Sequence, residues 1–251
     1  MSDIGKNDIP KFLDRTVLIL GEEAVCRIMK SHVLVLGIGG VGAYAAEMLV
    51  RSGVGKITIV DGDCVEYSNL NRQLVALNST IGKPKTEVLR ERLLDINPYC
   101  QVVAIQDFIR DEKIENLLLS DKFDYVVDAI DSLSPKVFFL AACKKMKLQV
   151  ISSMGSGARL DPTKLEIADI AKTYNCALAR AVRKRLKSLG INSGIKTVFS
   201  KETPNPDAVF AYQDENNCNH SITGTVSYIP CVFGCTLASF VIKELAKEVK
   251  N

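Results

Sequence analysis

Short apolar runs alternate with amphipathic segments along the first 153 residues of the chain. The segments between the runs carry apolar residues at helical spacing, as at Val88, Leu89, Leu93 and Ile96. Strands that alternate with helices predict an α/β fold with a Rossmann-like, doubly wound and largely parallel sheet. Strands are expected at residues 33–36, 56–61, 101–106, 125–131 and 148–152. Helices are expected at 41–51, between residues 82–85 and residue 96, at 114–119, and after residue 134, where Ser134 would be the N-cap.

The two ends of the chain differ from this pattern. Residues 11–29 have helical character, with Leu18, Ala24 and Ile28 expected to be buried. After Asp161 the pattern loosens, and residues 192–219 are rich in Ser, Asn, Gly, Pro and charge, which predicts a mobile loop. We therefore expect one domain over residues 1–251, built from N-terminal helices (1–30), a nucleotide-binding core (31–153) and a C-terminal extension of mixed strands and helices (154–251).

A glycine-rich turn follows the first apolar run. Residues 37–42 read Gly-Ile-Gly-Gly-Val-Gly, which places glycines at Gly37, Gly39, Gly40 and Gly42. Such a turn lets a phosphate approach backbone N–H groups closely, and the start of the next helix adds unpaired donors. Asp61, at the end of the second run, stands where an acid accepts hydrogen bonds from ribose hydroxyls. The pattern predicts an adenine nucleotide, and by itself leaves both NAD and ATP open.

Composition and cysteine usage indicate an ordinary reduced protein. The chain has 251 residues, of which 47% are hydrophobic, enough for a sizeable core without disulfides. Eight scattered cysteines and an N-terminus without a signal-peptide core predict a cytoplasmic location. The longest uncharged run, 221–242, is interrupted by Gly224, Pro230 and Gly234. We expect a buried core or dimer helix after Pro230 rather than a membrane span.

Positive charge is concentrated in one segment. Residues 170–201 contain eight Lys or Arg and no acid, so the net charge of +3 leaves −5 for the rest of the chain (3 − 8). On a helix, Arg180, Arg183, Lys184 and Lys187 would form one basic face, opposite an apolar face of Leu178, Val182, Leu186 and Leu189. A solvated surface is the ordinary interpretation of such a run. The complete absence of acids favours an RNA-binding face that follows phosphates without reading bases.

The loop after the second run distinguishes between nucleotides. Asp61, the run Asn69-Leu70-Asn71-Arg72-Gln73, then Gly82-Lys83-Pro84-Lys85 and Asp128-Ala129-Ile130-Asp131 resemble, in order, the motifs of the ubiquitin-activating-enzyme superfamily. Its bacterial members include the adenylyltransferases of molybdopterin and thiamine biosynthesis. The basic residues in these motifs suit the reaction of that superfamily. Attack of a carboxylate on the α-phosphorus of ATP brings two anions together, and it therefore needs cations around the phosphates.

The resemblance implies roles for particular residues. Asp61 would hold the ribose, Arg72 and Lys85 would neutralise the triphosphate, and Asp131 would hold Mg²⁺. Asn69 would contact phosphate or metal, and Asp63 belongs to the same nucleotide site. Arg15 resembles an arginine that reaches into the partner subunit's site, which implies a homodimer with Arg15, Arg72, Lys85 and Asp131 as the catalytic set.

Two features indicate the branch of the superfamily. The two Cys-x-x-Cys pairs of the zinc-bearing relatives are missing, since the nearest approach is Cys231-x-x-x-Cys235. Residues 161–164, 169–173 and 183–187 resemble the tRNA threonylcarbamoyladenosine dehydratases. That branch implies ATP-dependent dehydration, by cyclisation, of N6-threonylcarbamoyladenosine in tRNA through adenylation of its carboxylate. It also implies a monovalent cation, K⁺ or Na⁺, and coupling to a cysteine desulfurase system.

Other functions stay open at this point. The first alternative is an adenylyltransferase that activates the C-terminus of a ubiquitin-like sulfur carrier; an NAD-dependent oxidoreductase and a catalytically silent RNA-binding scaffold rank lower. The sequence leaves undecided whether Cys176, Cys218, Cys231 or Cys235 takes part in the chemistry, although packing thiols are the simpler interpretation.

Overall fold

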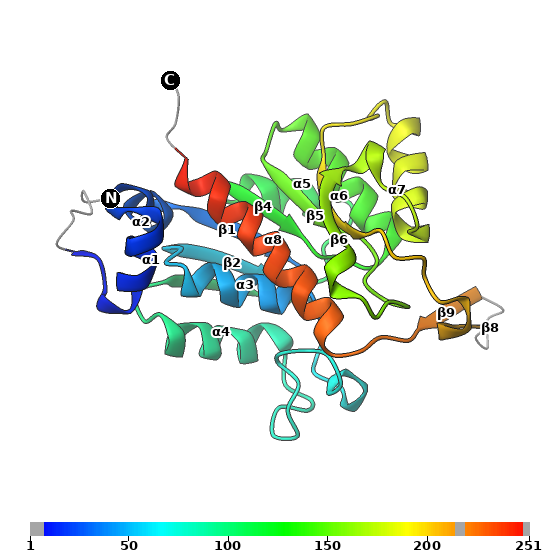
Figure 1. Cartoon of the computed structure of the whole chain (residues 1–251), viewed down its shortest axis with the longest axis horizontal. Helices are drawn as coiled ribbons and strands as arrows, with labels where there is room; N and C mark the ends of the chain where they lie inside the picture. The colour runs from blue at the N-terminus through cyan, green and yellow to red at the C-terminus, as the bar shows by residue number, and fades with distance from the viewer. Residues whose placement is uncertain (1–7, 214–218, 248–251) are drawn as a thin grey trace.

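The five predicted apolar runs become neighbouring strands of one sheet. The computed structural model describes residues 8–213 and 219–247 and contains a seven-stranded sheet in the order β3-β2-β1-β4-β5-β7-β6 (Figure 1). All pairs are parallel except that β6 runs antiparallel to β7, which confirms the largely parallel, doubly wound sheet. The strands are β1 (His32–Leu36), β2 (Lys56–Val60), β3 (Gln101–Ile105), β4 (Tyr125–Asp128), β5 (Val150–Ser153), β6 (Leu165–Asp169) and β7 (Lys196–Ser200).

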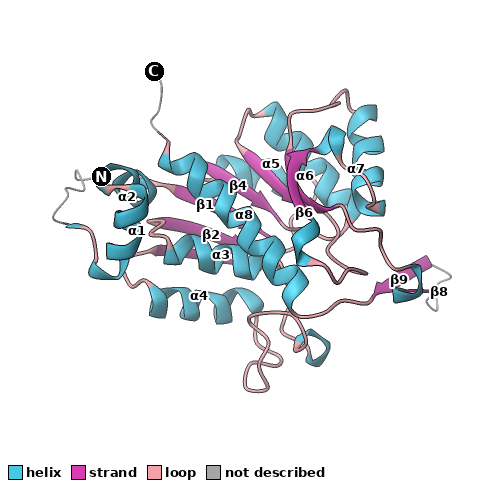
Figure 2. Cartoon of the chain, in the orientation of Figure 1, coloured by secondary structure: helices cyan, strands magenta, loops and turns pink. Residues whose placement is uncertain are grey.

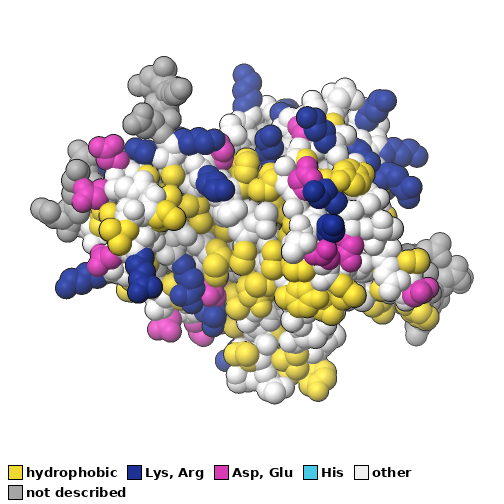
Figure 3. All heavy atoms as spheres, viewed as in Figure 1, with side chains coloured by type: hydrophobic (Ala, Val, Ile, Leu, Met, Phe, Trp, Pro, Cys, Tyr) yellow, Lys and Arg dark blue, Asp and Glu magenta, His cyan; other side chains and the backbone are white. Residues whose placement is uncertain are grey.

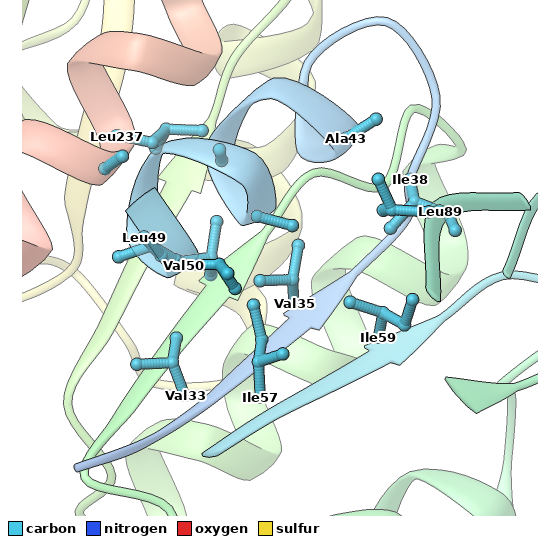
Figure 4. Close-up of a cluster of buried hydrophobic side chains, with 14 of the residues drawn as sticks. Val33, Val35, Ile38, Ala43, Leu49, Val50, Ile57, Ile59, Leu89 and Leu237 are labelled. Atoms are coloured by element: carbon cyan, nitrogen blue, oxygen red, sulfur yellow. The ribbon is translucent and has the colours of Figure 1, made fainter. Parts of the chain in front are cut away.

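Helices cover both faces of the sheet (Figure 2). On one face, side chains of α3, α4 and α8 join a core with β1 and β2, and on the other face α5, α6 and α7 form a second core. Figure 4 shows the first core, where Val33 and Ile57 of the strands lie beneath Leu49 of α3 and Ile59 lies beneath Leu89 of α4. The bounds are α1 (Asp14–Leu20), α2 (Glu22–Lys30), α3 (Gly42–Arg51), α4 (Lys85–Ile96), α5 (Glu112–Leu119), α6 (Leu133–Lys145), α7 (Ala177–Ser188) and α8 (Tyr228–Ala246).

The order of the strands fixes where a ligand can bind. From β1 the chain builds outward to β2 and β3, and then returns to place β4 on the other side of β1. The connections therefore diverge at the carboxyl ends of β1 and β4, which is where open α/β sheets hold their ligands. The glycine turn follows β1, and the segment that ends in Asp131 follows β4.

The N-terminal helical region is two helices rather than one. Gly21, with φ of 85°, separates α1 from α2, so the two helices do not share one continuous apolar face. Ala24 and Ile28 are buried as expected, whereas Leu18 is 87% exposed. The prediction that Leu18 is buried was wrong because the break at Gly21 turns α1 away from the packed face of α2.

The start of α6 also differs from expectation. Ser132, not Ser134, is its N-cap residue, and it makes no side-chain capping bond. The hydroxyl of Ser134, inside the first turn, instead accepts a hydrogen bond from Arg185 of α7 at 2.6 Å. Pro135 does lie in the first turn, where a residue without an N–H costs no helical hydrogen bond.

The predicted loop 192–219 contains ordered structure. Its residues Lys196–Ser200 form β7, whose Val198 and Phe199 are fully buried between the two helical layers. Further on, β8 (Val209–Gln213) pairs with β9 (Asn219–Thr223) in a two-stranded sheet; residues 214–218, Cys218 among them, lie outside the described part of the chain. The loop prediction was wrong because the apolar stretch in it is only two residues long, Val198-Phe199, and turn-forming residues lie on both sides of it.

The apolar run near the C-terminus forms α8, with Pro230 in its first turn. Among the described residues α8 is the one helix long and apolar enough to span a membrane, which is weak evidence for a span because core helices meet the same criterion. The helix crosses α3 at close range: a Cβ on Gly234 would lie 2.4 Å from the carbonyl oxygen of Val41. Side chains of α8 thus pack in the first core, as expected for a core helix.

Candidate nucleotide site

The glycine turn is built so that only glycine fits at its ends. Gly37 has φ of 84°, and a Cβ there would lie 2.8 Å from the carbonyl oxygen of Ala129. A Cβ on Gly42 would collide with the carbonyl oxygen of Gly37 at 1.8 Å. Within the described part of the chain, a Cβ on Gly39 would meet only Gln73, at 3.8 Å. The turn thus packs tightly against the segment after β4 and leaves an open approach at Gly39, as a phosphate cradle requires.

Asp61 is tied to that turn. Its carboxylate accepts the backbone N–H of Ile38 at 2.8 Å and that of Asp63 at 2.8 Å. Burial raises the pKa of Asp61, and the two N–H donors and Lys85 oppose that rise. The acid at the end of β2 therefore lies beside the glycine turn, and its role in binding ribose stays a prediction.

The polar loop after β2 brings Arg72 to the same place. Asn69 organises this loop: its side chain accepts the N–H of Glu66 at 3.2 Å, and its carbonyl accepts the N–H groups of Arg72 and Gln73. The Cγ of Arg72 lies 3.6 Å from the position that a Cβ on Gly40 would take. The guanidinium donates to the carbonyl of Ser68 and to Asn71, each at 2.8 Å. Asn69 is buried in this turn, so its clearest structural role is to hold the loop that carries Arg72.

Lys85 is the buried cation of the site. It opens α4, is 4% exposed, and donates to Asp63 at 2.9 Å. Lys83, two residues earlier, is exposed, as expected for a solvated loop lysine. Asp63 is about half exposed, and the charge of Lys85 acts to lower the pKa of Asp61, so the buried lysine lies at the inner edge of the site with its charge directed toward the two acids.

The two acids of the β4 motif have separate environments. Asp128 is fully buried and accepts hydrogen bonds from Ser152 at 2.6 Å and from the N–H of Ile130 at 3.0 Å. Asp131 is exposed and accepts only the hydroxyl of Ser132, at 3.1 Å, among the contacts described. Asp128 therefore caps the turn, and Asp131 is the acid available to a ligand.

The described residues contain no group of three or more His, Cys, Asp or Glu side chains placed to hold a metal ion. A single available carboxylate suits Mg²⁺, which proteins usually bind through one or two carboxylates together with the phosphates of a nucleotide. Cys231 and Cys235 lie half-buried on α8, and burial raises the pKa of Cys231 to about 11. Such a thiol is poorly suited to act as a thiolate nucleophile.

The basic segment forms α7, with most of its charge at the surface. Lys and Arg side chains gather over α7 in Figure 3. Ala179, Val182 and Leu186 are the buried positions, while Leu189 is 48% exposed. Arg180, Lys184 and Lys187 are exposed.

Arg183 differs from the other basic residues of α7. It is half-buried and donates to the carbonyl and the hydroxyl of Thr173. It therefore attaches α7 to the preceding segment, in contrast to the solvated face on which it was predicted.

Arg15 lies apart from this group. It is exposed on α1, and Figure 1 shows α1 and α2 at the end of the molecule where β1 begins, away from the carboxyl ends of the strands. The structure thus brings together the glycine turn, Asp61, Asp63, Arg72 and Lys85, with the Asp131 segment packed against the turn, and keeps Arg15 at a distance within one chain.

No role was predicted from the sequence for three residues that lie near the site. Lys136 is fully buried and lies 2.7 Å from Asp128; nothing in its helical context distinguishes it from a surface lysine. Among the described residues the Oε1 atom of Gln73 is buried and has no hydrogen-bond partner, so it is free to accept a bond from a water or a ligand. Phe108 is 52% exposed with its ring against Gly62, next to Asp61.

Comparison with known proteins agrees with this geometry. The model of the ThiF family matches residues 13–251. The tRNA threonylcarbamoyladenosine dehydratases of Bacillus subtilis and Escherichia coli are 38% and 36% identical, covering 94% and 92% of this chain and 95% and 91% of their own. The structure of the E. coli tRNA N6-threonylcarbamoyladenosine dehydratase in complex with ATP aligns with a TM-score of 0.83 at 34% identity, covering 94% of this chain and 93% of that one. This chain therefore belongs to the ThiF family, in the branch of the tRNA threonylcarbamoyladenosine dehydratases.

Proposed function

We propose that this protein dehydrates N6-threonylcarbamoyladenosine in tRNA by adenylating its carboxylate with ATP and closing a ring. The observation that carries the proposal is the placement of Arg72 and Lys85 beside the glycine turn that Asp61 contacts. Relatives of the same length and similar sequence bear that name, and the E. coli relative has been solved with ATP. These observations favour ATP over the redox coenzyme that the glycine turn alone left open.

The reaction can be written from the groups present. A carboxylate oxygen of the modified base attacks the α-phosphorus of ATP, and pyrophosphate leaves. A nitrogen of the neighbouring carbamoyl unit then attacks the activated carbonyl carbon, loses its proton and expels AMP, which keeps the carboxylate oxygen. The nucleophile is tethered to the reacting carbonyl, so a thioester on the enzyme is not required.

Each residue of the site has a task in this scheme. The backbone N–H groups of the glycine turn and the start of α3 bind phosphate oxygens, and Asp61 orients the ribose. Arg72 offers a planar, two-point contact and Lys85 a point charge to the phosphates, and both lower the repulsion between the two anions. Asp131 would hold Mg²⁺, which when bound supplies additional positive charge to the leaving pyrophosphate. Asn69 is buried and holds the loop that carries Arg72, and a contact from Asn69 to a phosphate or to the metal stays an expectation from the resemblance.

The basic face of α7 is proposed to bind the tRNA. Arg180, Lys184 and Lys187 are exposed on one helix, in a segment without a single acid, and such a row can follow a phosphate backbone. Arg183 is engaged with Thr173, so its contribution is to fix the position of α7 and place the other three.

A homodimer is proposed in which Arg15 completes the partner's site. Leu18 and Ile19 beside it are 87% and 81% exposed, and only 39% of the most apolar stretch of α8 is buried within one chain. Figure 3 shows apolar side chains gathered over α8. A second copy would cover these surfaces, since exposed apolar patches of this kind are typical of interfaces.

Three further expectations from the resemblance remain proposals: a monovalent cation (K⁺ or Na⁺), coupling to a cysteine desulfurase system, and a cytoplasmic location. The first is checked by measuring turnover in KCl, NaCl and choline chloride at one ionic strength. The second is checked by whether a desulfurase with its sulfur acceptor alters turnover of the purified protein.

The decisive experiment incubates the protein with ATP, Mg²⁺ and tRNA that carries threonylcarbamoyladenosine, followed by nucleoside mass spectrometry. We expect the modified nucleoside to lose the mass of one water while AMP and pyrophosphate appear in equal amounts. The alternative, activation of a ubiquitin-like sulfur carrier, predicts pyrophosphate exchange that depends on such a carrier and is unaffected by tRNA. An intact modified nucleoside after complete reaction would refute the proposal.

A further inference from the structure

Lys136 is a charged residue in an unusual place. Its side chain is 0% exposed, and its Nζ lies 2.7 Å from the carboxylate of Asp128, which is also 0% exposed. Burying two charges is costly, and a buried ion pair often stabilises a fold no better than apolar residues of the same volume. The described contacts of this lysine therefore point to a role besides stability.

Lys136 and Asp128 both form hydrogen bonds with the backbone of one residue in the segment after β4. Lys136 donates to the carbonyl oxygen of Ile130 at 2.7 Å, and Asp128 accepts the N–H of the same Ile130 at 3.0 Å. Ser152 of β5 donates to Asp128 at 2.6 Å. Both backbone polar groups of Ile130 are thus held by buried side chains from β4 and α6.

That segment lies between the glycine turn and Asp131. The N–H of Ala129 donates to the carbonyl of Leu36 at 2.9 Å, and a Cβ on Gly37 would lie 2.8 Å from the carbonyl oxygen of Ala129. Asp131 follows Ile130 directly and has its carboxylate at the surface. Lys136 and Asp128 hold the backbone of Ile130, and this backbone fixes the position and orientation of the next residue, Asp131.

We propose that Lys136 is a positioning residue for the reaction: through the carbonyl of Ile130 it fixes Asp131 in the orientation that nucleotide-bound Mg²⁺ needs. This inference rests on the proposed function for the role of Asp131. Lys136 touches no substrate and acts through Ile130. A lysine that served only to neutralise Asp128 would be dispensable once Asp128 lost its charge.

The test uses that difference. The double variant Asp128→Asn/Lys136→Met removes both charges together. The amide oxygen introduced at position 128 can still accept the N–H of Ile130, and its NH₂ group can donate to the Ser152 hydroxyl, which changes from donor to acceptor. Of the two bonds that hold Ile130, only the one to its carbonyl is therefore removed. Lys136→Met alone shows the cost of a lone buried carboxylate. Lys145→Met, at an exposed lysine of the same helix, is the matched control.

Three readouts are taken on each protein: thermal midpoint, hydrogen–deuterium exchange of peptides covering residues 126–135 without nucleotide, and ATP affinity by calorimetry with and without Mg²⁺. The double variant is expected to melt within a few degrees of the unaltered protein, since no lone charge is buried. Exchange at residues 129–131 should rise about 10-fold or more. The gain in ATP affinity that Mg²⁺ provides should fall about 10-fold, while affinity without Mg²⁺ changes little.

A double variant that matches Lys145→Met in exchange and in the response to Mg²⁺ would overturn the proposal and leave Lys136 as a charge-neutralising residue. If the unaltered protein binds ATP with Mg²⁺ but does not dehydrate tRNA, the proposed function fails while these readouts still decide the role of Lys136. Absence of any Mg²⁺-dependent ATP binding in the unaltered protein would overturn both.

Discussion

Lys85 donates a hydrogen bond to Asp63 across 2.9 Å, and this pair joins the start of α4 to the loop after β2. The lysine is buried and the aspartate is about half exposed, so the pair marks the inner edge of the nucleotide site. A cation fixed in this way is available to phosphates that enter over the glycine turn, with little reorganisation.

Lys85→Met should therefore lower the rate of tRNA dehydration by about 10²-fold or more, as expected when one preorganised charge is removed from phosphoryl chemistry. The matched control is Lys83→Met, because Lys83 is exposed and lies two residues away. Steady-state kinetics with ATP as the varied substrate provide the comparison. Equal losses in the two variants would show that Lys85 has no special role.

Much of this site could be predicted because its residues follow strand ends. Gly37, Asp61 and Asp128 each stand at or directly after the carboxyl end of a parallel strand, and the topology of a doubly wound sheet brings such positions together. Sequence spacing identified these residues without knowledge of any contact.

The rest depended on tertiary structure. The exposure of Leu18 follows from the backbone at Gly21, and the burial of Lys136 follows from the position of α6 over Asp128. β7 was missed because its central strand position is set by pairing with β5 and β6, while its flanking residues are typical of loops. Neither pairing nor burial of a single lysine leaves a local signal in the sequence.

Asp61→Asn is expected to weaken ATP binding by about 10-fold or more, because a charge-assisted hydrogen bond to ribose is removed. Its effect on stability depends on pH. Burial raises the pKa of Asp61, so the carboxylate form costs stability at pH values above that raised pKa, and the cost disappears as the pH falls through it.

Thermal melting of Asp61→Asn and the unaltered protein should therefore show the variant to be at least as stable at pH 8, with the difference shrinking as the pH is lowered toward 4. A variant that is less stable at pH 8 and gains relative stability on acidification would mean that the carboxylate stabilises the glycine turn, contrary to the direction of the pKa shift.

Charge reversal on α7 tests the proposed tRNA surface. Arg180→Glu, Lys184→Glu and Lys187→Glu should each weaken tRNA binding and reduce the slope of log affinity against log salt by about 1 for each phosphate that is no longer bound. ATP affinity should stay unchanged. Arg183→Ala should act differently and lower the free energy of unfolding by about 1–2 kcal/mol, since it removes hydrogen bonds from a charged donor to Thr173. Unaltered tRNA affinity in all three charge reversals would exclude α7 from the interface.

Complementation tests whether Arg15 acts across a dimer. Arg15→Ala and Lys85→Ala proteins should each be inactive alone. Mixed in equal amounts and allowed to exchange subunits, they should recover about a quarter of the activity, because half of the dimers are then mixed and each mixed dimer has one intact site. If the mixture stays inactive while light scattering shows a dimer, Arg15 does not act in the partner's site. If light scattering shows a monomer, the proposed homodimer itself is wrong.

The fate of one oxygen atom tests the central claim most directly. With tRNA whose threonylcarbamoyl carboxylate carries ¹⁸O, attack on the α-phosphorus of ATP predicts one ¹⁸O atom in the AMP that is released, for each ring closed, and none in pyrophosphate. Label found in inorganic phosphate with ADP as the second product, or AMP without label, would contradict activation of the carboxylate by adenylation.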